Sequence, residues 1–244
     1  MEEFIFGTRA VIEAISAGKN IERVLLQKKT VSAGSQELFS LLRQNNIAFQ
    51  FVPVEKLNRV TRKNHQGVIA FISLVSYTPL EEIVSRAYES GKDPFILILD
   101  HISDVRNFGA IARTAECAGI DGIIIPEKGS VRITADAIKT SAGALMKIPV
   151  AQVISLREAI NYLCMSGLTI VSATEKSDTY LYDAGLTGPI ALIMGSEDIG
   201  ITASLLELSN KRVKIPMQGE IGSLNVSVAA GVVIYEIIRQ RLAQ

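Results

Sequence analysis

The sequence predicts an α/β protein with a small N-terminal module and a larger C-terminal domain built on a parallel β-sheet. Apolar residues at helical spacing alternate with short apolar runs along the chain. The runs after residue 94 are nearly continuous, as in parallel strands that are covered on both faces. With 244 residues, of which 48% are hydrophobic, the chain can bury one large core or two smaller ones.

The first module is expected to span residues 1–76. Its helices and strands should alternate, in the order helix Thr8–Gly18, strand Ile21–Leu26, a helix marked by Leu38, Leu41 and Leu42, strand Ala48–Val52, helix Val54–Val60 and strand Val68–Leu74. Residues 76–79 interrupt the periodicity, so residues 77–93 are expected to form a linker and a leading helix, Leu80–Ser90.

Residues 94–244 carry the second series, which predicts a doubly wound sheet. The expected strands are Phe95–Leu99, Gly122–Ile125, Ile148–Val153, Leu168–Ala173, Ile190–Met194 and Val213–Ile215. The expected helices are Gly109–Ala118, Thr134–Leu145, Leu156–Met165, Thr202–Leu208 and Val226–Leu242. The last helix is apolar around most of its circumference, so it is either central to one core or shared with a second subunit.

Composition excludes several classes of protein. No apolar run approaches the roughly 18 residues of a membrane-spanning helix, and Met1-Glu2-Glu3 is acidic where a signal peptide would be basic. We therefore expect a cytoplasmic protein with no membrane partner. Two distant cysteines and two histidines cannot form a zinc site or a disulfide framework, so no metal is expected.

Charge is unevenly distributed, although the net charge of the whole chain is zero. Residues 1–76 carry ten lysines and arginines against six glutamates, a net charge of +4, and the rest of the chain is correspondingly acidic. A basic module fits a nucleic-acid partner, and it fits equally a surface that only keeps the module soluble.

Ligands of parallel α/β sheets bind beyond the carboxyl ends of the strands, so the loops after Leu99, Met194 and Ile215 are candidate sites. In the first loop Asn107 can cap a helix, and Gly109 allows another segment to approach closely. Arg113 lies in the second turn of the expected helix and would reach back over the loop. The alternative for Arg113 is an ordinary surface arginine.

The second and third loops combine glycines with polar residues. Gly195-Ser196-Glu197 leads to Gly200, and these glycines alone could serve only the turn. The third loop ends in Ser223-Leu224-Asn225-Val226-Ser227, where Ser223 or Asn225 could be a simple N-cap of the last helix.

In this order and at these separations, the three loops resemble the signature motifs of the SpoU/TrmH methyltransferases of the SPOUT superfamily. Asn107, Gly109 and Arg113 match the first motif, and the segments 195–200 and 223–227 match the second and third. Further resemblance lies in Phe6-Gly7, His65-Gln66-Gly67-Val68 and Lys139-Thr140-Ser141-Ala142-Gly143-Ala144, so it covers nearly the whole chain. Val105, Asp198 and Met146 depart from the family pattern without removing a catalytic side chain.

The resemblance implies a SPOUT domain with a deep trefoil knot, S-adenosylmethionine as methyl donor, and transfer to an RNA ribose 2′-hydroxyl. It implies a site for the cofactor around Thr174, Gly195, Gly200, Ile215, Met217 and Leu224. The expected catalytic group is Arg113 with Asn107, Glu197, Ser223 and Asn225. Arginine is a poor base, because its guanidinium holds its proton far above neutral pH, so we assign Arg113 to an RNA phosphate and to charge that develops on the 2′-oxygen.

The resemblance also implies partners. Residues 1–76 look like a substrate-binding domain, in which Arg9, Arg59, Arg62, Lys63 and His65 are expected to contact RNA. The nearest branch methylates guanosine in bacterial 23S rRNA, a tRNA substrate stays open, and family members pair as homodimers through the knot region. Two rival functions are a non-catalytic RNA-binding protein and a Rossmann dehydrogenase, for which Asn107-Phe108-Gly109 offers one glycine only.

Overall fold

The computed structural model describes residues 4–28, 35–45 and 47–243, and the chain divides into two compact units, residues 1–76 and 77–244. Met1-Glu2-Glu3 and Lys29, which entered the charge analysis, lie outside the described residues. None of the described helices is long and apolar enough to cross a membrane.

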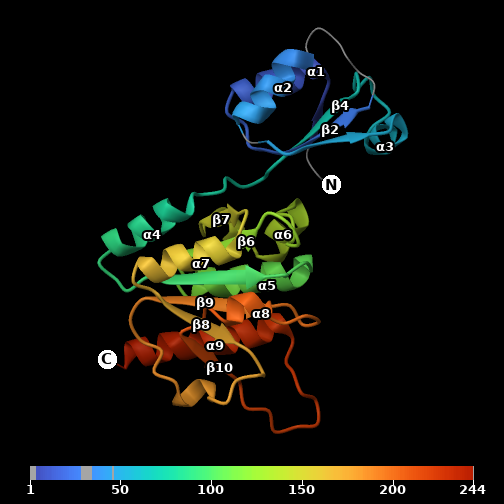
Figure 1. Cartoon of the computed structure of the whole chain (residues 1–244). Helices are drawn as coiled ribbons and strands as arrows, with labels where there is room; N and C mark the ends of the chain where they lie inside the picture. Colours follow the sequence, from blue (N-terminus) through green and yellow to red (C-terminus); the bar gives the residue numbers. More distant parts are fainter. Residues whose placement is uncertain (1–3, 29–34, 46, 244) are drawn as a thin grey trace. The chain divides into compact units, whose positions relative to one another are not determined.

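The first unit is a four-stranded mixed sheet with the strand order β1-β4-β2-β3 (Figure 1). Strands β2 and β3 are parallel, and β4 is antiparallel to both β1 and β2. The elements of this unit follow in the order β1 (Phe4–Phe6), α1 (Thr8–Ser16), β2 (Ile21–Gln27), α2 (Ser35–Gln44), β3 (Phe49–Val52), α3 (Val54–Val60) and β4 (Val68–Ile72). Residues of α1 and α2 share an apolar cluster with one face of the sheet, and Leu57 of α3 packs on the other.

Strand β1 was absent from the sequence prediction. Three residues are too few to display an alternating pattern, and β1 is a strand because it pairs with β4, with Phe4 opposite Phe71. Such a pairing is a long-range contact that local periodicity cannot reveal.

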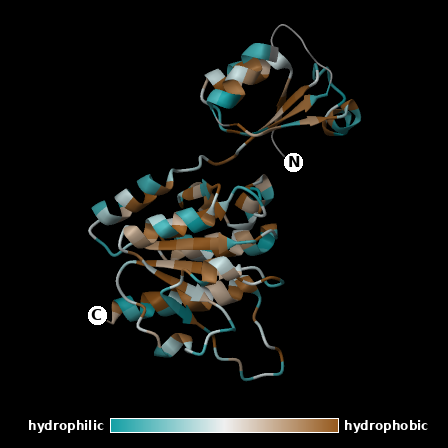
Figure 2. Ribbon diagram, viewed as in Figure 1, coloured by the Kyte–Doolittle hydropathy of each residue, from teal (hydrophilic) through white to brown (hydrophobic). Residues whose placement is uncertain are grey.

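The second unit is a six-stranded parallel sheet with the order β10-β8-β9-β5-β6-β7. Its strands are β5 (Phe95–Asp100), β6 (Gly122–Pro126), β7 (Val150–Val153), β8 (Thr169–Ala173), β9 (Ile190–Gly195) and β10 (Lys211–Val213). Its helices are α4 (Leu80–Glu89), α5 (Val105–Cys117), α6 (Ala135–Thr140), η1 (Ala144–Met146), α7 (Leu156–Met165), η2 (Leu181–Asp183), α8 (Ala203–Leu206) and α9 (Val226–Leu242). The central strands are hydrophobic along their length (Figure 2), as expected for a sheet covered on both faces.

Helices α4, α7 and α8 share an apolar core with one face of this sheet, and α5 and α9 pack against each other and against the rest of the unit. The observed architecture confirms the α/β class, the small N-terminal unit and the C-terminal parallel sheet. The trefoil knot stays a prediction.

Several boundaries differ from the sequence prediction, and two of the differences have a local physical cause. Helix α5 begins at Val105 instead of Gly109, because the side chain of Asp104 accepts hydrogen bonds from the backbone N–H groups of residues 106 and 107. The helix expected over Thr134–Leu145 is split, because Ala142 and Gly143 have positive φ angles of 52° and 85°. The last strand lies two residues earlier than expected, so Ile215 belongs to the loop after it.

Candidate active site

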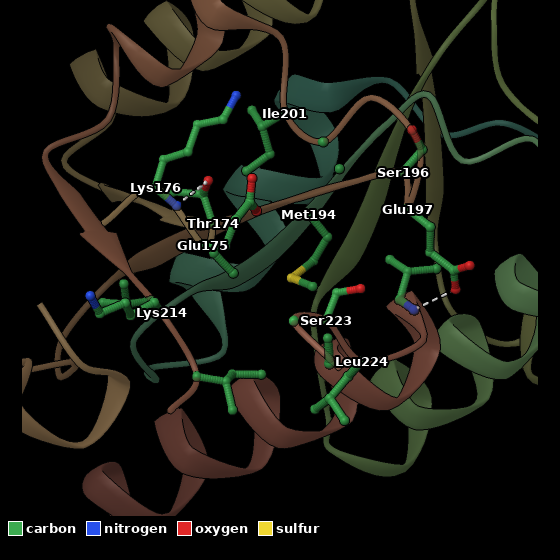
Figure 3. A pocket seen from close by; sticks show the side chains of 18 of the residues that line it. Thr174, Glu175, Lys176, Met194, Ser196, Glu197, Ile201, Lys214, Ser223 and Leu224 are labelled. Atoms are coloured by element: carbon green, nitrogen blue, oxygen red, sulfur yellow. Dashed lines mark hydrogen bonds between the residues drawn. The ribbon is translucent and has the colours of Figure 1, made fainter. Parts of the chain in front are cut away.

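A pocket of about 630 Å³ lies beyond the carboxyl ends of β8, β9 and β10 and beside the start of α9 (Figure 3). All six residues predicted to bind the cofactor line it, namely Thr174, Gly195, Gly200, Ile215, Met217 and Leu224. Gly195 is the last residue of β9, and the other five come from the loops after β8, β9 and β10. The pocket therefore lies at the edge of the sheet where ligands of α/β proteins bind.

The wall formed by Gly195 and Gly200 depends on the absence of a side chain. A Cβ at position 195 would lie 2.1 Å from the carbonyl carbon of Gly200, closer than real atoms approach. The backbone N–H of Gly200 donates to the carbonyl of Ser196 at 2.9 Å, and Gly200 has a φ of 73°. Both glycines therefore shape a tight loop, and that loop forms one side of the pocket.

The three sequence motifs meet at Asn225. Its side-chain Nδ2 donates to Asn107 Oδ1 at 3.0 Å and to Glu197 Oε1 at 2.5 Å. The same carboxylate oxygen accepts from the backbone N–H of Val226 at 2.8 Å, a hydrogen bond drawn in Figure 3. We call Asn107, Glu197 and Asn225 the polar cluster. The sequence predicted all three residues but not their mutual contact.

Asn225 is also the N-cap of α9. Its Oδ1 accepts from the backbone N–H of Ser227 at 3.0 Å and from the hydroxyl of Ser227 at 2.6 Å. The capping role that the sequence allowed for Asn225 is therefore real and coexists with its contacts to the other motifs. Ser223 lines the pocket, and Figure 3 shows it beside Met194.

Asn107 is not a helix cap, because Asp104 takes that position and Asn107 lies in the first turn of α5. The earlier start of α5 moves Arg113 from the second turn to the third. Arg113 is exposed and, like Asn107 and Asn225, it does not line the pocket.

Charged residues that the sequence analysis did not select also line the pocket. Glu175 and Lys176 follow Thr174, Lys214 precedes Ile215, and Asp198 follows Glu197 (Figure 3). The Lys214 ammonium lies 5.0 Å from the centre of the Tyr180 ring. The signal for Glu175, Lys176 and Asp198 was their place in loops that follow a strand, whereas Lys214 fell inside the predicted strand Val213–Ile215.

The first unit holds the predicted RNA-contacting residues. Arg9, Arg59, Arg62 and Lys63 are exposed. His65 is only 8% exposed, and its Nδ1 accepts from the backbone N–H of Gly67 at 3.0 Å. Because Nδ1 accepts, the proton lies on Nε2, which is 3.0 Å from Asn58 Oδ1. Both ring nitrogens are thus occupied within the protein, and His65 holds the loop in place.

That loop adjoins the other segment with family resemblance. The backbone N–H of Gly7 donates to the carbonyl of Val68 at 3.0 Å, and Gln66 Oε1 accepts from the backbone N–H of Thr8 at 3.3 Å. The two segments, distant in sequence, are therefore joined by hydrogen bonds at the start of α1.

No three His, Cys, Asp or Glu side chains in the described part of the chain gather in a way that could hold a metal ion.

Comparison with known proteins places this site in a family. The model of the SpoU rRNA methylase family matches residues 94–235, and the model for RNA 2′-O ribose methyltransferase substrate binding matches residues 4–78. A protein of Bacillus subtilis named as a TrmH family tRNA/rRNA methyltransferase, YacO, is 34% identical over 98% of this chain and 96% of its own length. A TrmH family tRNA/rRNA methyltransferase of Staphylococcus saprophyticus is 37% identical over 99% of this chain and 97% of its own length.

Solved structures agree with these matches. The crystal structure of an RNA 2′-O ribose methyltransferase is 28% identical, with a TM-score of 0.58, and covers 98% of this chain and 88% of its own. The SpoU methyltransferase AviRb from Streptomyces viridochromogenes, solved in complex with AdoMet, has the same fold, with 24% identity, a TM-score of 0.64 and coverage of 100% and 92%. The chain therefore belongs to the SpoU/TrmH family of RNA 2′-O-ribose methyltransferases.

Proposed function

We propose that this protein transfers the methyl group of S-adenosylmethionine to the ribose 2′-hydroxyl of a guanosine in 23S rRNA. The observation that carries the proposal is the polar cluster of Asn107, Glu197 and Asn225 beside the glycine-walled pocket. The N-terminal unit that matches a substrate-binding model favours the ribosomal-RNA branch of the family, and tRNA is the alternative substrate.

The pocket fits the methyl donor. Its volume of about 630 Å³ lies within the range of roughly 300–1,000 Å³ typical of small-molecule sites. Ile215, Met217 and Leu224 supply apolar surface for an adenine ring, and the loop of Gly195 and Gly200 leaves backbone groups accessible. When bound there, S-adenosylmethionine supplies an electrophilic methyl group.

The polar cluster orients the ribose. Asn225 is held from two sides by Asn107 and Glu197, so its amide has one fixed position. A cluster fixed before substrate binds can hold the 2′-oxygen in line with the methyl carbon without further reorganisation. The oxygen forms its bond to that carbon as the carbon–sulfur bond breaks, and the hydroxyl proton leaves the oxygen.

We assign Arg113 to binding of the RNA substrate and to stabilisation of the reacting oxygen. Its exposed guanidinium can bind a phosphate of the substrate, which accepts the proton, and it stabilises negative charge on the 2′-oxygen. RNA binding itself therefore completes the catalytic group.

We also propose that the protein is a homodimer. On α9, Val228, Tyr235 and Leu242 are spaced seven residues apart, so they share one face of the helix. Their exposed fractions are 52%, 51% and 83%, whereas Val233, Ile234 and Ile237 are fully buried. The same face of a second copy would cover the exposed side chains.

Mapping of 2′-O-methyl positions in RNA from cells that lack the gene tests the substrate. Loss of one methylated guanosine in 23S rRNA is expected, and loss of a tRNA position instead would select the alternative. Calorimetry with the purified protein should detect S-adenosylmethionine and no NAD binding. Methyl transfer that persists in a chelator would agree with a reaction that needs no metal.

A further inference from the structure

His101 occupies a strained position at the carboxyl end of β5. Its φ is 57°, in the left-handed region that glycine adopts freely and other residues adopt at a cost. The residue before it, Asp100, is buried and accepts a hydrogen bond from the backbone N–H of Thr202 at 2.8 Å. A glycine at position 101 would satisfy the same turn without strain, so the fold alone does not explain a histidine there.

The imidazole of His101 lies between the side chain of Asp100 and the backbone of Gly129. Its Nε2 is 3.5 Å from Asp100 Oδ1, and a Cβ added to Gly129 would lie 3.3 Å from its Nδ1. Because Gly129 has no side chain, the imidazole ring can lie directly against it. The adjacent Ser130 has a buried hydroxyl without a hydrogen-bond partner among the described residues, and Lys128 on the other side of Gly129 is exposed. The side chain of His101 keeps 40% of its surface exposed.

His101 lies at the same edge of the sheet as the proposed catalytic centre. In the parallel sheet Asp100 lies opposite Gly195, so the loops that carry His101 and Glu197 leave the same edge. The pocket extends over β9, β8 and β10, whereas His101 lies against Gly129 in the loop after β6, on the other side of β5. An RNA strand whose target ribose enters the polar cluster can therefore continue across His101.

We propose that His101 is an RNA-binding residue that contacts the ribose-phosphate backbone of a nucleotide next to the target. The inference rests on the proposed function and extends it to a residue outside the three motifs. The imidazole offers a hydrogen-bond donor for a phosphate or an acceptor for a 2′-hydroxyl. Strain at a partly exposed residue beside a catalytic centre is typical of groups held ready for a ligand.

The variant His101→Gly tests the proposal, because glycine keeps the backbone angle and removes only the side chain. We expect the KM for RNA to rise about tenfold, the loss of one hydrogen bond to a charged group, with an unchanged Kd for S-adenosylmethionine. The thermal midpoint should equal or exceed that of the wild type, since strain is relieved. His101→Asn, which tolerates the left-handed region and retains polar atoms, should recover part of the RNA affinity.

Wild-type values of KM and kcat in His101→Gly would overturn the proposal. A wild-type protein that binds RNA but transfers no methyl group would instead count against the proposed function. In that case the RNA affinity of His101→Gly relative to the wild type, measured by fluorescence anisotropy, would still decide whether His101 makes the contact.

Discussion

Asn225 combines two tasks that use different atoms of one amide. The oxygen caps α9, and the nitrogen joins Asn107 and Glu197. Within the described structure, the side-chain amide N–H groups of Asn225 are the only donors of the polar cluster that link all three motifs. A substitution can therefore remove the bridge while keeping the cap.

Asn225→Asp should retain the fold and lose catalysis. Aspartate still accepts from Ser227, but it has no N–H for Asn107 and places a second carboxylate beside Glu197. We expect kcat to fall at least about 100-fold, with a near-normal thermal midpoint. Asn225→Ala should lose the cap as well, at about 1 kcal/mol of stability. Equal activity of Asn225→Asp and the wild type would show that the bridge is dispensable.

Arg113→Ala should abolish methylation and leave S-adenosylmethionine affinity nearly unchanged, because Arg113 lies outside the pocket. A fall in kcat of at least about 100-fold is expected, because the charge on the 2′-oxygen is no longer stabilised. Methyl transfer from a labelled donor and calorimetry measure the two effects. Arg86→Ala, at an exposed arginine of α4 paired with Glu82, is the control and should behave as wild type. Failure of folded Arg113→Ala to bind the cofactor would contradict the assigned role.

Among the elements, α9 contributes both to the polar cluster and to the core of the second unit. It begins at Val226, with Asn225 as its N-cap, and buries Ala230, Val233 and Ile237. Near its end Arg241 donates to the carbonyls of Asp93, Pro94 and Gly188, which lie at or just before the starts of β5 and β9. Burial lowers the pKa of Arg241, and burial also raises the pKa of Asp121 nearby. The helix is thus attached at both ends.

Glu236 on α9 should make stability dependent on pH. Hydrogen bonds from Arg239 at 2.8 Å, opposed by burial, hold the pKa of this carboxyl below its usual value. Because the pKa of Glu236 is lower in the folded state, its carboxylate stabilises the fold at pH values above the usual carboxyl pKa. This contribution is lost as the pH falls through the pKa of the folded state. Urea unfolding of the wild type and Glu236→Gln should therefore differ most at neutral pH and converge in acid.

Glu82→Gln provides the matched control for this measurement, since the Glu82–Arg86 pair is exposed. Its unfolding should follow that of the wild type at every pH. A difference between the wild type and Glu236→Gln that stays constant from neutral pH into acid would contradict the assignment.

The exposed face of α9 should hold the dimer. Tyr235→Lys would bury a charge in the proposed interface and should give a monomer by light scattering. Met165→Lys changes an 82% exposed apolar residue on α7 and should leave the mass unchanged. If the wild-type protein is a monomer at micromolar concentration, this face of α9 is not a dimer interface.

At the scale of the whole molecule, each unit has its own sheet and its own apolar cluster. Two separate cores suggest that residues 77–244 can fold without the first unit. The first unit has the positive net charge, and the second unit holds the pocket.

Deletion of residues 1–76 should leave a folded, dimeric protein that binds S-adenosylmethionine and methylates RNA very poorly. For every RNA phosphate that the first unit binds, its deletion should reduce the salt slope of RNA binding by about one unit. Fluorescence anisotropy over a salt series, beside calorimetry, measures both properties. Unchanged RNA affinity and slope would contradict an RNA-binding role, and aggregation with loss of cofactor binding would indicate that the first unit only stabilises the second.

Most of the fold could be predicted because its signals are local. Helices α3, α7 and α9 begin and end at the predicted residues, since helical periodicity and terminal residues are properties of adjacent sequence. The rule that ligands bind beyond the carboxyl ends of parallel strands predicted where the pocket lies, and all six residues predicted from the motifs to bind the cofactor line it. The missed features were β1, the split at Ala142 and the cap at Asp104, which depend on pairing, on a strained φ and on competition between two possible caps.

The sequence by itself determined the fold class, the family and the residue types of the site, because periodicity and motif spacing are written along the chain. Only the tertiary structure decided which of those residues meet. It joined Asn107, Glu197 and Asn225, left Arg113 outside the pocket and turned His65 inward. It also showed the strain at His101. Contacts between residues of different elements depend on the packing of strands and helices, and no local pattern encodes that packing.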